Sequence, residues 1–265
     1  MKEAEEMAYD TLLVEQKDHI ATVTFNRPKQ MNALDLVMRS ELKTLLADLS
    51  TDPQVKIVIL TGAGGKAFCA GGDITTMANV AAPAGRDRLR SVGLITKMMA
   101  DMEKPIIAAV NGIAVGAGMN IALAADMIIA SETARFRETF ANIGLIPDLG
   151  GFYTLSVRVG IPKAKELMMT TRFIEAKEAE AIGLVNRIVP QDQLMKEVNA
   201  LAAFLAKGPS RVYGMIKTAL NLWPMNLQAY MELEANMQAV AFATKDFDEG
   251  RRAFLEKRAP EFTGE

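Results

Sequence analysis

Two glycine-rich stretches, Ala67-Phe68-Cys69-Ala70-Gly71-Gly72-Asp73-Ile74 and Asn111-Gly112-Ile113-Ala114-Val115-Gly116-Ala117-Gly118-Met119-Asn120, organise this chain of 265 residues. Each follows an apolar run typical of a buried strand, residues 55–61 before the first and 105–110 before the second. The second stretch opens into an apolar helical segment at 119–125. Strand, turn and helix in this order predict an α/β fold with bare turns at the ends of strands.

Glycine lacks a Cβ atom, so the backbone of both turns can approach a ligand closely. The helix that follows the second turn adds partial positive charge at its N-terminal N–H groups. Two such turns can direct two peptide N–H groups at one oxygen atom, which is the geometry of an oxyanion hole. Glycine spacing alone also fits ordinary turns, so other parts of the sequence are needed to distinguish an oxyanion hole from such turns.

Composition limits the classes of protein that remain. Half of the residues are apolar, and 30 basic against 32 acidic residues give a net charge of −2, which argues against nucleic acid or an anionic membrane as partner. Cys69 is the only cysteine, which excludes an internal disulfide and a cysteine-built metal site, and we expect no metal. The acidic N-terminus lacks the features of a signal or transit peptide, so we expect a cytoplasmic protein. The apolar stretch 106–129 contains Asn, Asp and Gly residues, which favours a buried strand-turn-helix-strand over a membrane span.

Periodicity predicts how the elements follow one another. Residues 19–25 alternate as a strand does, 35–49 have helical spacing, and 192–205, 209–222 and 227–242 read as successive amphipathic helices. Residues 78–90, rich in Ala, Pro and Gly, predict a mobile loop that shapes the acyl pocket or is a variable surface loop.

The two glycine-rich stretches resemble the signature turns of the enoyl-CoA hydratase/isomerase family, also called the crotonase superfamily. Four further motifs resemble that family in the same order: residues 25–34 (FNRPKQMNAL), 143–151 (IGLIPDLGG), 181–186 (AIGLVN) and 249–258 (EGRRAFLEKR). The resemblance covers nearly the whole chain. It implies a spiral of β-β-α turns with the acyl-CoA site in residues 1–195, and a C-terminal helical region, 196–265, that builds trimers, often paired into hexamers, and contacts coenzyme A.

The resemblance also implies where the chemistry takes place. A thioester carbonyl gains negative charge when its α-carbon loses a proton or its β-carbon is attacked, and the family's two donors to that oxygen correspond to the N–H groups of Gly72 and Ala117. The hydratases of the family place two glutamates at positions that correspond here to Asn120 and Phe140. Neither residue can transfer a proton, so water addition by paired carboxylates is not expected at these positions.

Two other carboxylates remain as candidates. Asp148 corresponds to an acid/base aspartate in family members that shift double bonds, and moving a double bond needs only one carboxylate; its spacing also fits a helix cap before residues 150–155. Glu138 lies two residues before Phe140 and would share its face of a strand, which offers an alternative register. Outside that register, we expect Glu138 to be solvated or paired, or to reach the pocket if the loops fold over it.

The resemblance predicts coenzyme A as part of the substrate, with no separate cofactor. The residues expected to bind the substrate are Arg27, Pro28, Ala33, Ala70, Asp73, Ile74, Phe140, Phe254 and Lys257. Of these, Asp73 is also expected to stabilise its own turn, and Phe254 and Lys257 often act from a neighbouring subunit in the family. We expect an enoyl-CoA isomerase that converts 3-enoyl-CoA to 2-enoyl-CoA through Asp148. The alternatives are a hydratase or hydrolase that positions water with Asn120 and Glu138 or Asp148, and a catalytically silent acyl-CoA-binding homologue.

Overall fold

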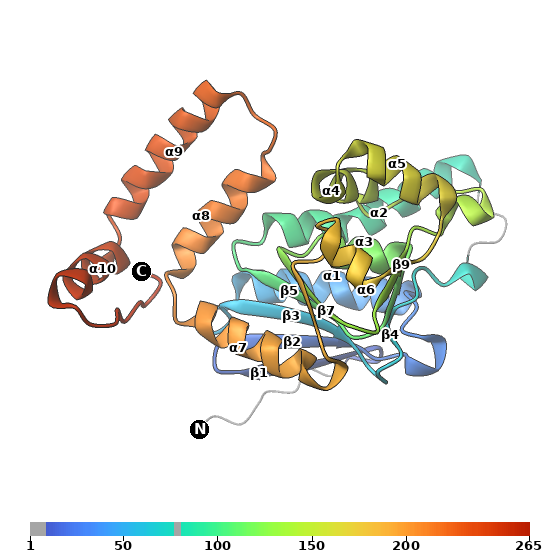
Figure 1. The fold of residues 1–265 in the computed structure, drawn as a ribbon, viewed down its shortest axis with the longest axis horizontal. Helices are drawn as coiled ribbons and strands as arrows, with labels where there is room; N and C mark the ends of the chain where they lie inside the picture. The colour runs from blue at the N-terminus through green and yellow to red at the C-terminus, as the bar shows by residue number, and fades with distance from the viewer. Residues whose placement is uncertain (1–8, 77–80) are drawn as a thin grey trace.

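The computed structural model describes residues 9–76 and 81–265 (Figure 1). Its larger sheet has six strands in the order β1-β2-β3-β5-β7-β10, and all neighbours except the antiparallel pair β1 and β2 run parallel. The bounds are β1 (Leu12–Lys17), β2 (Ile20–Phe25), β3 (Ile57–Gly62), β5 (Ile106–Val110), β7 (Met127–Ser131) and β10 (Arg187–Val189).

A smaller sheet of four strands has the order β4-β6-β8-β9, with bounds β4 (Ala67–Cys69), β6 (Ile113–Val115), β8 (Arg135–Arg137) and β9 (Ile174–Glu175). Successive strands alternate between the sheets, because β3 and β4, β5 and β6, and β7 and β8 each contribute one strand to both. The chain therefore winds as a spiral, and each turn of it brings a strand end to the same edge. The α/β fold expected from the sequence is confirmed.

Helices cover both faces of the larger sheet. Their bounds are α1 (Leu36–Thr51), α2 (Ala82–Asp101), α3 (Ala117–Leu123), α4 (Gly151–Val159), α5 (Ile161–Thr170), α6 (Ala176–Ala181) and α7 (Leu194–Ala206). In β3, Val58 and Leu60 pack into the main core with α1, α2 and α3, whereas Ile57 and Ile59 pack against α7. Every residue of this strand is buried, which explains its continuous apolar sequence.

The prediction of a loop over residues 78–90 is wrong for 82–90, which form the first half of α2, while 78–80 lie outside the described residues. Ala81 is the extended residue before the helix, and Pro83 lies in the first turn. Proline is tolerated there because its missing N–H would have no partner within the helix. The proline therefore marks a helix start in this chain.

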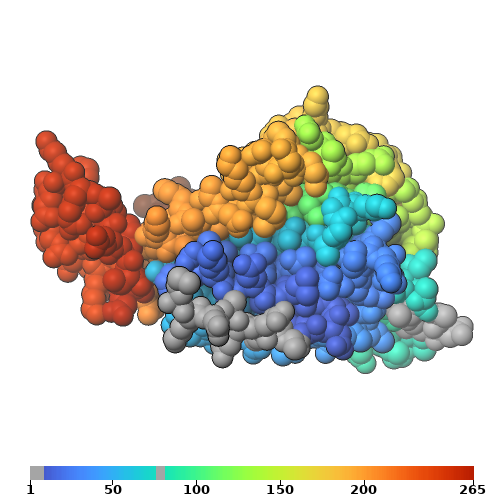
Figure 2. All heavy atoms as spheres, turned by 90° about the horizontal axis from the view of Figure 1, so that it is seen from below, coloured from blue at the N-terminus to red at the C-terminus, as the bar shows by residue number. Residues whose placement is uncertain are grey.

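The last three helices are α8 (Ser210–Asn221), which packs against the body of the molecule, and α9 (Leu227–Phe242) and α10 (Lys245–Glu256), which stand away from it (Figure 1). Figure 2 shows the chain end as a lobe beside the main body. No residue of α9 is buried, although apolar side chains such as Leu227, Val240 and Phe242 lie along it. Among the described residues, no helix combines the length and apolar character needed to cross a bilayer.

A buried ion pair holds α8 to the body. The Nζ atom of Lys217 lies 2.9 Å from the Asp126 carboxylate, and the Lys217 side chain is only 5% exposed. Lys217 also donates to the carbonyl of Lys104 (3.2 Å), and Asp126 accepts from the N–H of Ile106 (2.7 Å). Burial lowers the pKa of Lys217 and raises that of Asp126, so each charge depends on the other.

Replacing Lys217 with Met should therefore lower the free energy of unfolding at pH 7 by about 3 kcal/mol, because Asp126 would stay buried without its cation. Urea denaturation of wild type and variant measures this. The double variant Lys217→Met/Asp126→Asn removes the stranded charge and should recover most of the loss; a double variant no more stable than the single one would contradict this explanation.

Candidate active site

The first glycine turn is fixed by a single β-bridge between Leu34 and Gly72. The Leu34 N–H donates to the Gly71 carbonyl (2.8 Å), and the Asp73 N–H donates to the Leu34 carbonyl (3.0 Å). In a parallel bridge of this kind, the residue between those two bonds directs its own N–H to the opposite side. The N–H of Gly72 therefore points away from Leu34, and within the described chain it has no hydrogen-bond acceptor.

The second turn places Ala117 at the start of α3. Gly116 precedes it with φ +53°, a conformation that favours glycine, and its N–H donates to the Arg137 carbonyl (2.8 Å). Ala117 is the first residue of the helix, so its N–H has no acceptor within α3. No hydrogen bond from this N–H occurs among residues 9–76 and 81–265.

The two turns are in direct backbone contact. A Cβ atom built on Gly118 would lie 2.2 Å from the Cys69 carbonyl oxygen, and one built on Gly71 would lie 2.7 Å from the Val115 oxygen and 3.6 Å from the Ala117 nitrogen. Only glycine permits this approach at residues 71 and 118. The structure thus brings the two sequence-predicted donor turns together at one place, and donation by both to one oxygen stays a prediction.

Asn120 is fully buried one helical turn after Ala117. Its Nδ2 atom donates to the Asp148 carbonyl (2.9 Å), and its Oδ1 atom is buried without a hydrogen-bond partner in the described chain. The glycine at position 151 leaves room for this amide, because a Cβ there would lie 2.4 Å from Nδ2. Asn120 therefore holds the backbone of the Asp148 turn against α3.

The alternative that Asp148 caps a helix is wrong. α4 begins at Gly151 with Gly150 as its N-cap, and no side chain caps it. The Oδ1 atom of Asp148 is instead buried and has no partner in the described chain. Burial raises the pKa of Asp148, while the positive charges of Arg39 and Arg88 act in the opposite direction.

Glu138 is the residue whose environment the sequence analysis missed. It is 1% exposed, and neither carboxylate oxygen has a hydrogen-bond partner in the part of the chain that the structure describes. The expectation that it is solvated or paired is wrong. The two residues Glu138 and Phe140 do not share a strand, because β8 ends at Arg137 and a 3-10 turn begins at Phe140, although both side chains are buried. Burial, followed by the charge of Asp148, raises the pKa of Glu138 to about 8.

The raised pKa of Glu138 should make the stability of the protein depend on pH. An unfolded Glu138 loses its proton near pH 4.5, whereas the folded protein keeps it up to about pH 8. Between these values the folded state binds more protons, so its stability is highest at low pH and falls as pH rises. Glu138 should therefore lower the free energy of unfolding by at most about 4 kcal/mol between pH 5 and 8.

Glu138→Gln should abolish that decrease and make the variant the more stable protein at pH 8. Urea denaturation at several pH values measures it. Equal pH dependence in the two proteins would mean that Glu138 is ionised in the folded state.

Phe140 and Arg39 complete the surroundings of the two carboxyls. The Phe140 ring lies 3.7 Å from the position of a Cβ on Gly116, so it forms apolar wall beside the second turn. Arg39, from α1, is 6% exposed, and its Nε atom lacks a partner among the described residues. Burial lowers the pKa of Arg39, and Asp148 is one of the carboxylates that favour its charge.

The residues of the first motif hold the Gly72 turn. The Arg27 guanidinium lies 3.2 Å from Asp35 and 3.5 Å from Asp73, and it donates to the Ala33 carbonyl (2.6 Å). Asp73 also accepts from the Thr75 hydroxyl (2.6 Å), which confirms that it stabilises its turn.

Some of the other predicted substrate-binding residues lie close to this turn, and others lie far from it. Pro28 packs beside Gly64, Ala70 donates to the Met31 carbonyl (3.0 Å), and Ile74 is 64% exposed next to the turn. Phe254 and Lys257 are exposed at the end of α10, which stands apart from this site in the single chain (Figure 1). Substrate contacts of all these residues stay predictions.

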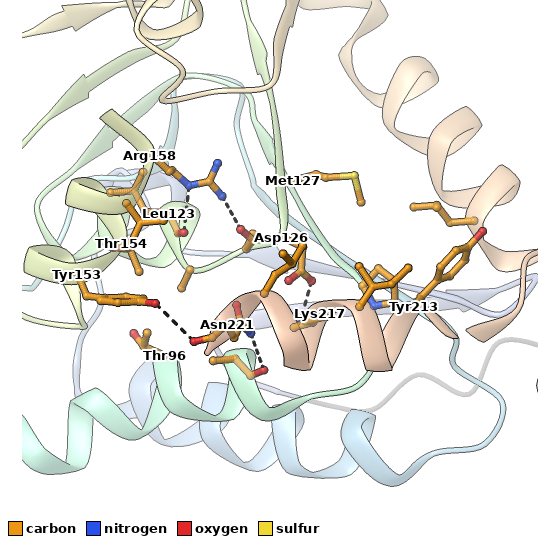
Figure 3. Close-up of a pocket in the computed structure, with 18 residues that line it drawn as sticks. Thr96, Leu123, Asp126, Met127, Tyr153, Thr154, Arg158, Tyr213, Lys217 and Asn221 are labelled. Carbon is orange, nitrogen blue, oxygen red and sulfur yellow. Dashed lines mark hydrogen bonds and ion pairs between the residues drawn. The ribbon is translucent and has the colours of Figure 1, made fainter. Parts of the chain in front are cut away.

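A separate cavity of about 500 Å³ lies between α2, α4, α8 and the end of α3. Figure 3 shows its charged groups engaged with the protein: Lys217 contacts Asp126, and Arg158 donates to the carbonyls of Leu123 (3.4 Å) and Ala125 (2.6 Å). The residues that line the cavity include none of the candidate groups Gly72, Ala117, Glu138 and Asp148, so it is separate from the candidate catalytic site.

An α/β spiral with two glycine turns in contact beside buried carboxyl groups defines the class of protein, and comparison with known proteins identifies it. The family described as enoyl-CoA hydratase/isomerase matches residues 15–265. A crotonyl-CoA hydratase of Syntrophomonas wolfei is 38% identical over 97% of this chain and 99% of that protein. A 1,2-epoxyphenylacetyl-CoA isomerase of Escherichia coli is 35% identical over 92% of this chain and 95% of that protein.

Solved structures agree with this match. An enoyl-CoA hydratase of Bacillus anthracis has a TM-score of 0.92 at 34% identity, covering 97% of this chain and 100% of that one. The chain belongs to the enoyl-CoA hydratase/isomerase family, the crotonase superfamily, and is an acyl-CoA enzyme of that family.

Proposed function

We propose that this enzyme is an enoyl-CoA isomerase that moves the double bond of a 3-enoyl-CoA to the 2,3 position, with Asp148 as acid/base. The observation that carries the proposal is the buried Oδ1 atom of Asp148, which neither caps α4 nor bonds to any described residue. A carboxylate held in this way is available to a substrate proton. Its raised pKa makes it a stronger base than an ordinary aspartate.

The reaction follows from the two turns. The thioester oxygen accepts hydrogen bonds from the N–H groups of Gly72 and Ala117, which stabilise the enolate that forms when Asp148 removes a proton from C2. A proton then returns at C4, and the double bond shifts without consumption of water. Arg27, Pro28, Ala33, Ala70, Asp73 and Ile74 lie along the route proposed for coenzyme A beside the first turn.

The two replaced glutamate positions support isomerisation over hydration. Phe140 adds apolar wall where a hydratase of the family has a carboxylate. Asn120 uses its amide N–H to hold the Asp148 carbonyl and has no basic group. Neither residue activates a water molecule for attack on C3.

Hydration is the second candidate function, and Glu138 is the observation that favours it. With Asp148, this buried carboxyl group gives the site two acid/base groups. The relative from Syntrophomonas wolfei is named as a hydratase of crotonyl-CoA, a 2-enoyl thioester. In this alternative the two carboxyls hold water in place of the missing glutamates.

Product analysis in D2O separates the candidates. The purified enzyme is incubated with a 3-enoyl-CoA and, separately, with a 2-enoyl-CoA, and the thioesters are identified by mass spectrometry. Isomerisation gives 2-enoyl-CoA, with deuterium exchange at C2 of the remaining 3-enoyl-CoA, and hydration gives 3-hydroxyacyl-CoA. Binding of a non-reactive acyl-CoA without either product would leave the catalytically silent homologue as the remaining interpretation.

We also propose that α9 and α10 form the contacts of a homotrimer, alone or paired into a hexamer. The exposed apolar side chains of these helices support it, because monomeric proteins rarely expose large apolar patches. In such an assembly Phe254 and Lys257 would reach the nucleotide of a neighbouring subunit. Light scattering should give the mass of three or six chains, and a monomer would contradict the proposal.

A further inference from the structure

Buried polar atoms without partners are concentrated at the proposed site. Within the described residues six such side-chain atoms occur, and five of them belong to four side chains there: Arg39, Asn120, Glu138 and Asp148. Buried polar groups are nearly always hydrogen-bonded in folded proteins. Their clustering distinguishes this site from the rest of the described chain, where only the Asn111 Oδ1 atom is buried without a partner.

Backbone contacts place Glu138 beside the second donor turn. The carbonyl of Arg137, the preceding residue, accepts the hydrogen bond from Gly116, and Val115 pairs with Arg137 in the smaller sheet. Thr139, the following residue, has its Cγ2 atom 3.3 Å from the position of a Cβ on Gly116. Glu138 thus lies between two residues that contact the turn carrying the Ala117 N–H.

The nearby charges have different effects on the carboxyl groups of Asp148 and Glu138. Arg39 on α1 and Arg88 on α2 both favour the charged form of Asp148. Glu138 has burial and the negative charge of Asp148 against its ionisation, and no cation among its principal influences. Asp35 and Asp73, the other carboxylates that act on Arg39, already pair with Arg27.

We propose that Glu138 is a second catalytic residue, which carries a proton at rest and delivers it to C4 after Asp148 has taken the proton from C2. Arg39 is the positioning residue that keeps Asp148, rather than Glu138, ionised. This inference rests on the proposed isomerase function and assigns the proton return, which one carboxylate could otherwise perform alone.

The protons and electrons of the cycle balance. The Asp148 carboxylate accepts the C2 proton, and the electrons of that C–H bond form the enolate. When the enolate collapses, the electrons of the former 3,4 double bond form a new C4–H bond with the Glu138 proton. Asp148 is then protonated and Glu138 ionised, and transfer of one proton from Asp148 to Glu138 restores the resting state.

Isotope transfer tests whether Asp148 removes the C2 proton while Glu138 delivers the C4 proton. A 3-enoyl-CoA deuterated at C2 is converted in ordinary water by the whole enzyme, and deuterium at C4 of the 2-enoyl-CoA product is measured by NMR. With enzyme in excess, so that each site turns over once, the wild type should deliver the Glu138 proton, and its product should carry almost no deuterium at C4. In Glu138→Gln only Asp148 can return a proton, so retention at C4 should rise severalfold while kcat falls about 10²-fold.

The control variant is Glu132→Gln, which changes an exposed carboxylate of the same segment and should match the wild type in rate and label. If Glu138→Gln isomerises at the wild-type rate, or if wild type and variant retain the same label, the inference is overturned while the isomerase function stands. If the wild type forms no 2-enoyl-CoA at all, the isomerase function fails, and with it the delivery to C4.

The resting proton can be tested without any turnover. Infrared difference spectra at pH 6.5 should show the C=O band of a buried carboxylic acid in the wild type and in Glu132→Gln, and its loss in Glu138→Gln. Absence of that band in the wild type overturns the proposal whatever the activity.

Variants of Arg39 test the positioning role. Arg39→Met should move the acidic limb of the pH–rate profile upward, because Asp148 would lose the cation that favours its charge, and Arg39→Lys should restore most of the original limb. A purely structural role would lower the activity of Arg39→Met without moving its pH profile.

Discussion

Asp148→Asn lowers kcat for isomerisation of a 3-enoyl-CoA by about 10³-fold, because an amide has the shape of the carboxylate but cannot accept the C2 proton. The Asp148 backbone, which Asn120 holds, should be unaffected, so the affinity for a non-reactive acyl-CoA should stay within about twofold of wild type by the same reasoning. Steady-state kinetics and calorimetry measure the two quantities.

The matched control for this variant is Asp192→Asn, which changes an exposed aspartate ahead of α7 and should leave the rate unchanged. Full activity of Asp148→Asn on every 3-enoyl-CoA tried would remove Asp148 from the mechanism. Solvent-deuterium exchange at C2 should disappear together with turnover, because both require removal of the same proton.

Gly118→Ala is expected to lower kcat by about 10²- to 10³-fold, the effect of losing one oxyanion donor. The added Cβ would lie 2.2 Å from the backbone oxygen of Cys69, so one of the two turns has to move. That movement separates the Gly72 and Ala117 N–H groups. Measured kcat should fall more than acyl-CoA affinity, because the donors act most strongly on the enolate.

Gly93→Ala provides the control for the glycine substitution. Gly93 lies in α2, and apart from its chain neighbours and the backbone of its own helix no described atom lies within 4 Å of the position of its added Cβ. Alanine there should preserve activity and raise the free energy of unfolding by up to about 1 kcal/mol through helix propensity. A Gly118→Ala enzyme as active as Gly93→Ala would show that close contact of the turns is not required.

The elements that the sequence predicted well are those whose apolar pattern is set by local burial. The apolar run 105–110 is β5, buried throughout, and the predicted helix 227–242 matches α9. Periodicity did not indicate α10, because its composition is largely polar, and only the family resemblance predicted a helix there. Its start does carry a local signal: Thr244 caps it through the Phe247 N–H, and Asp246 and Asp248 lie in its first turn.

The candidate site could be predicted only where its chemistry is carried by the backbone. Glycine content indicates a close approach of chains, so the two turns could be found from sequence. The surroundings of a carboxyl group depend on tertiary packing, and capping and catalysis place Asp148 at the same spacing. For Glu138 the sequence does hold a signal. Apolar Ala134, Phe136 and Phe140 alternate with polar residues, and Glu138 occupies a position of the apolar set; all four side chains are buried in the structure.

A crystal structure with a non-reactive analogue of a 3-enoyl-CoA tests the central claim most directly. The thioester oxygen should lie about 2.7–3.1 Å from the amide nitrogens of both Gly72 and Ala117, with C2 and C4 facing the carboxyl groups of Asp148 and Glu138. A thioester oxygen bound elsewhere, or two N–H groups that point away from each other, would contradict the account.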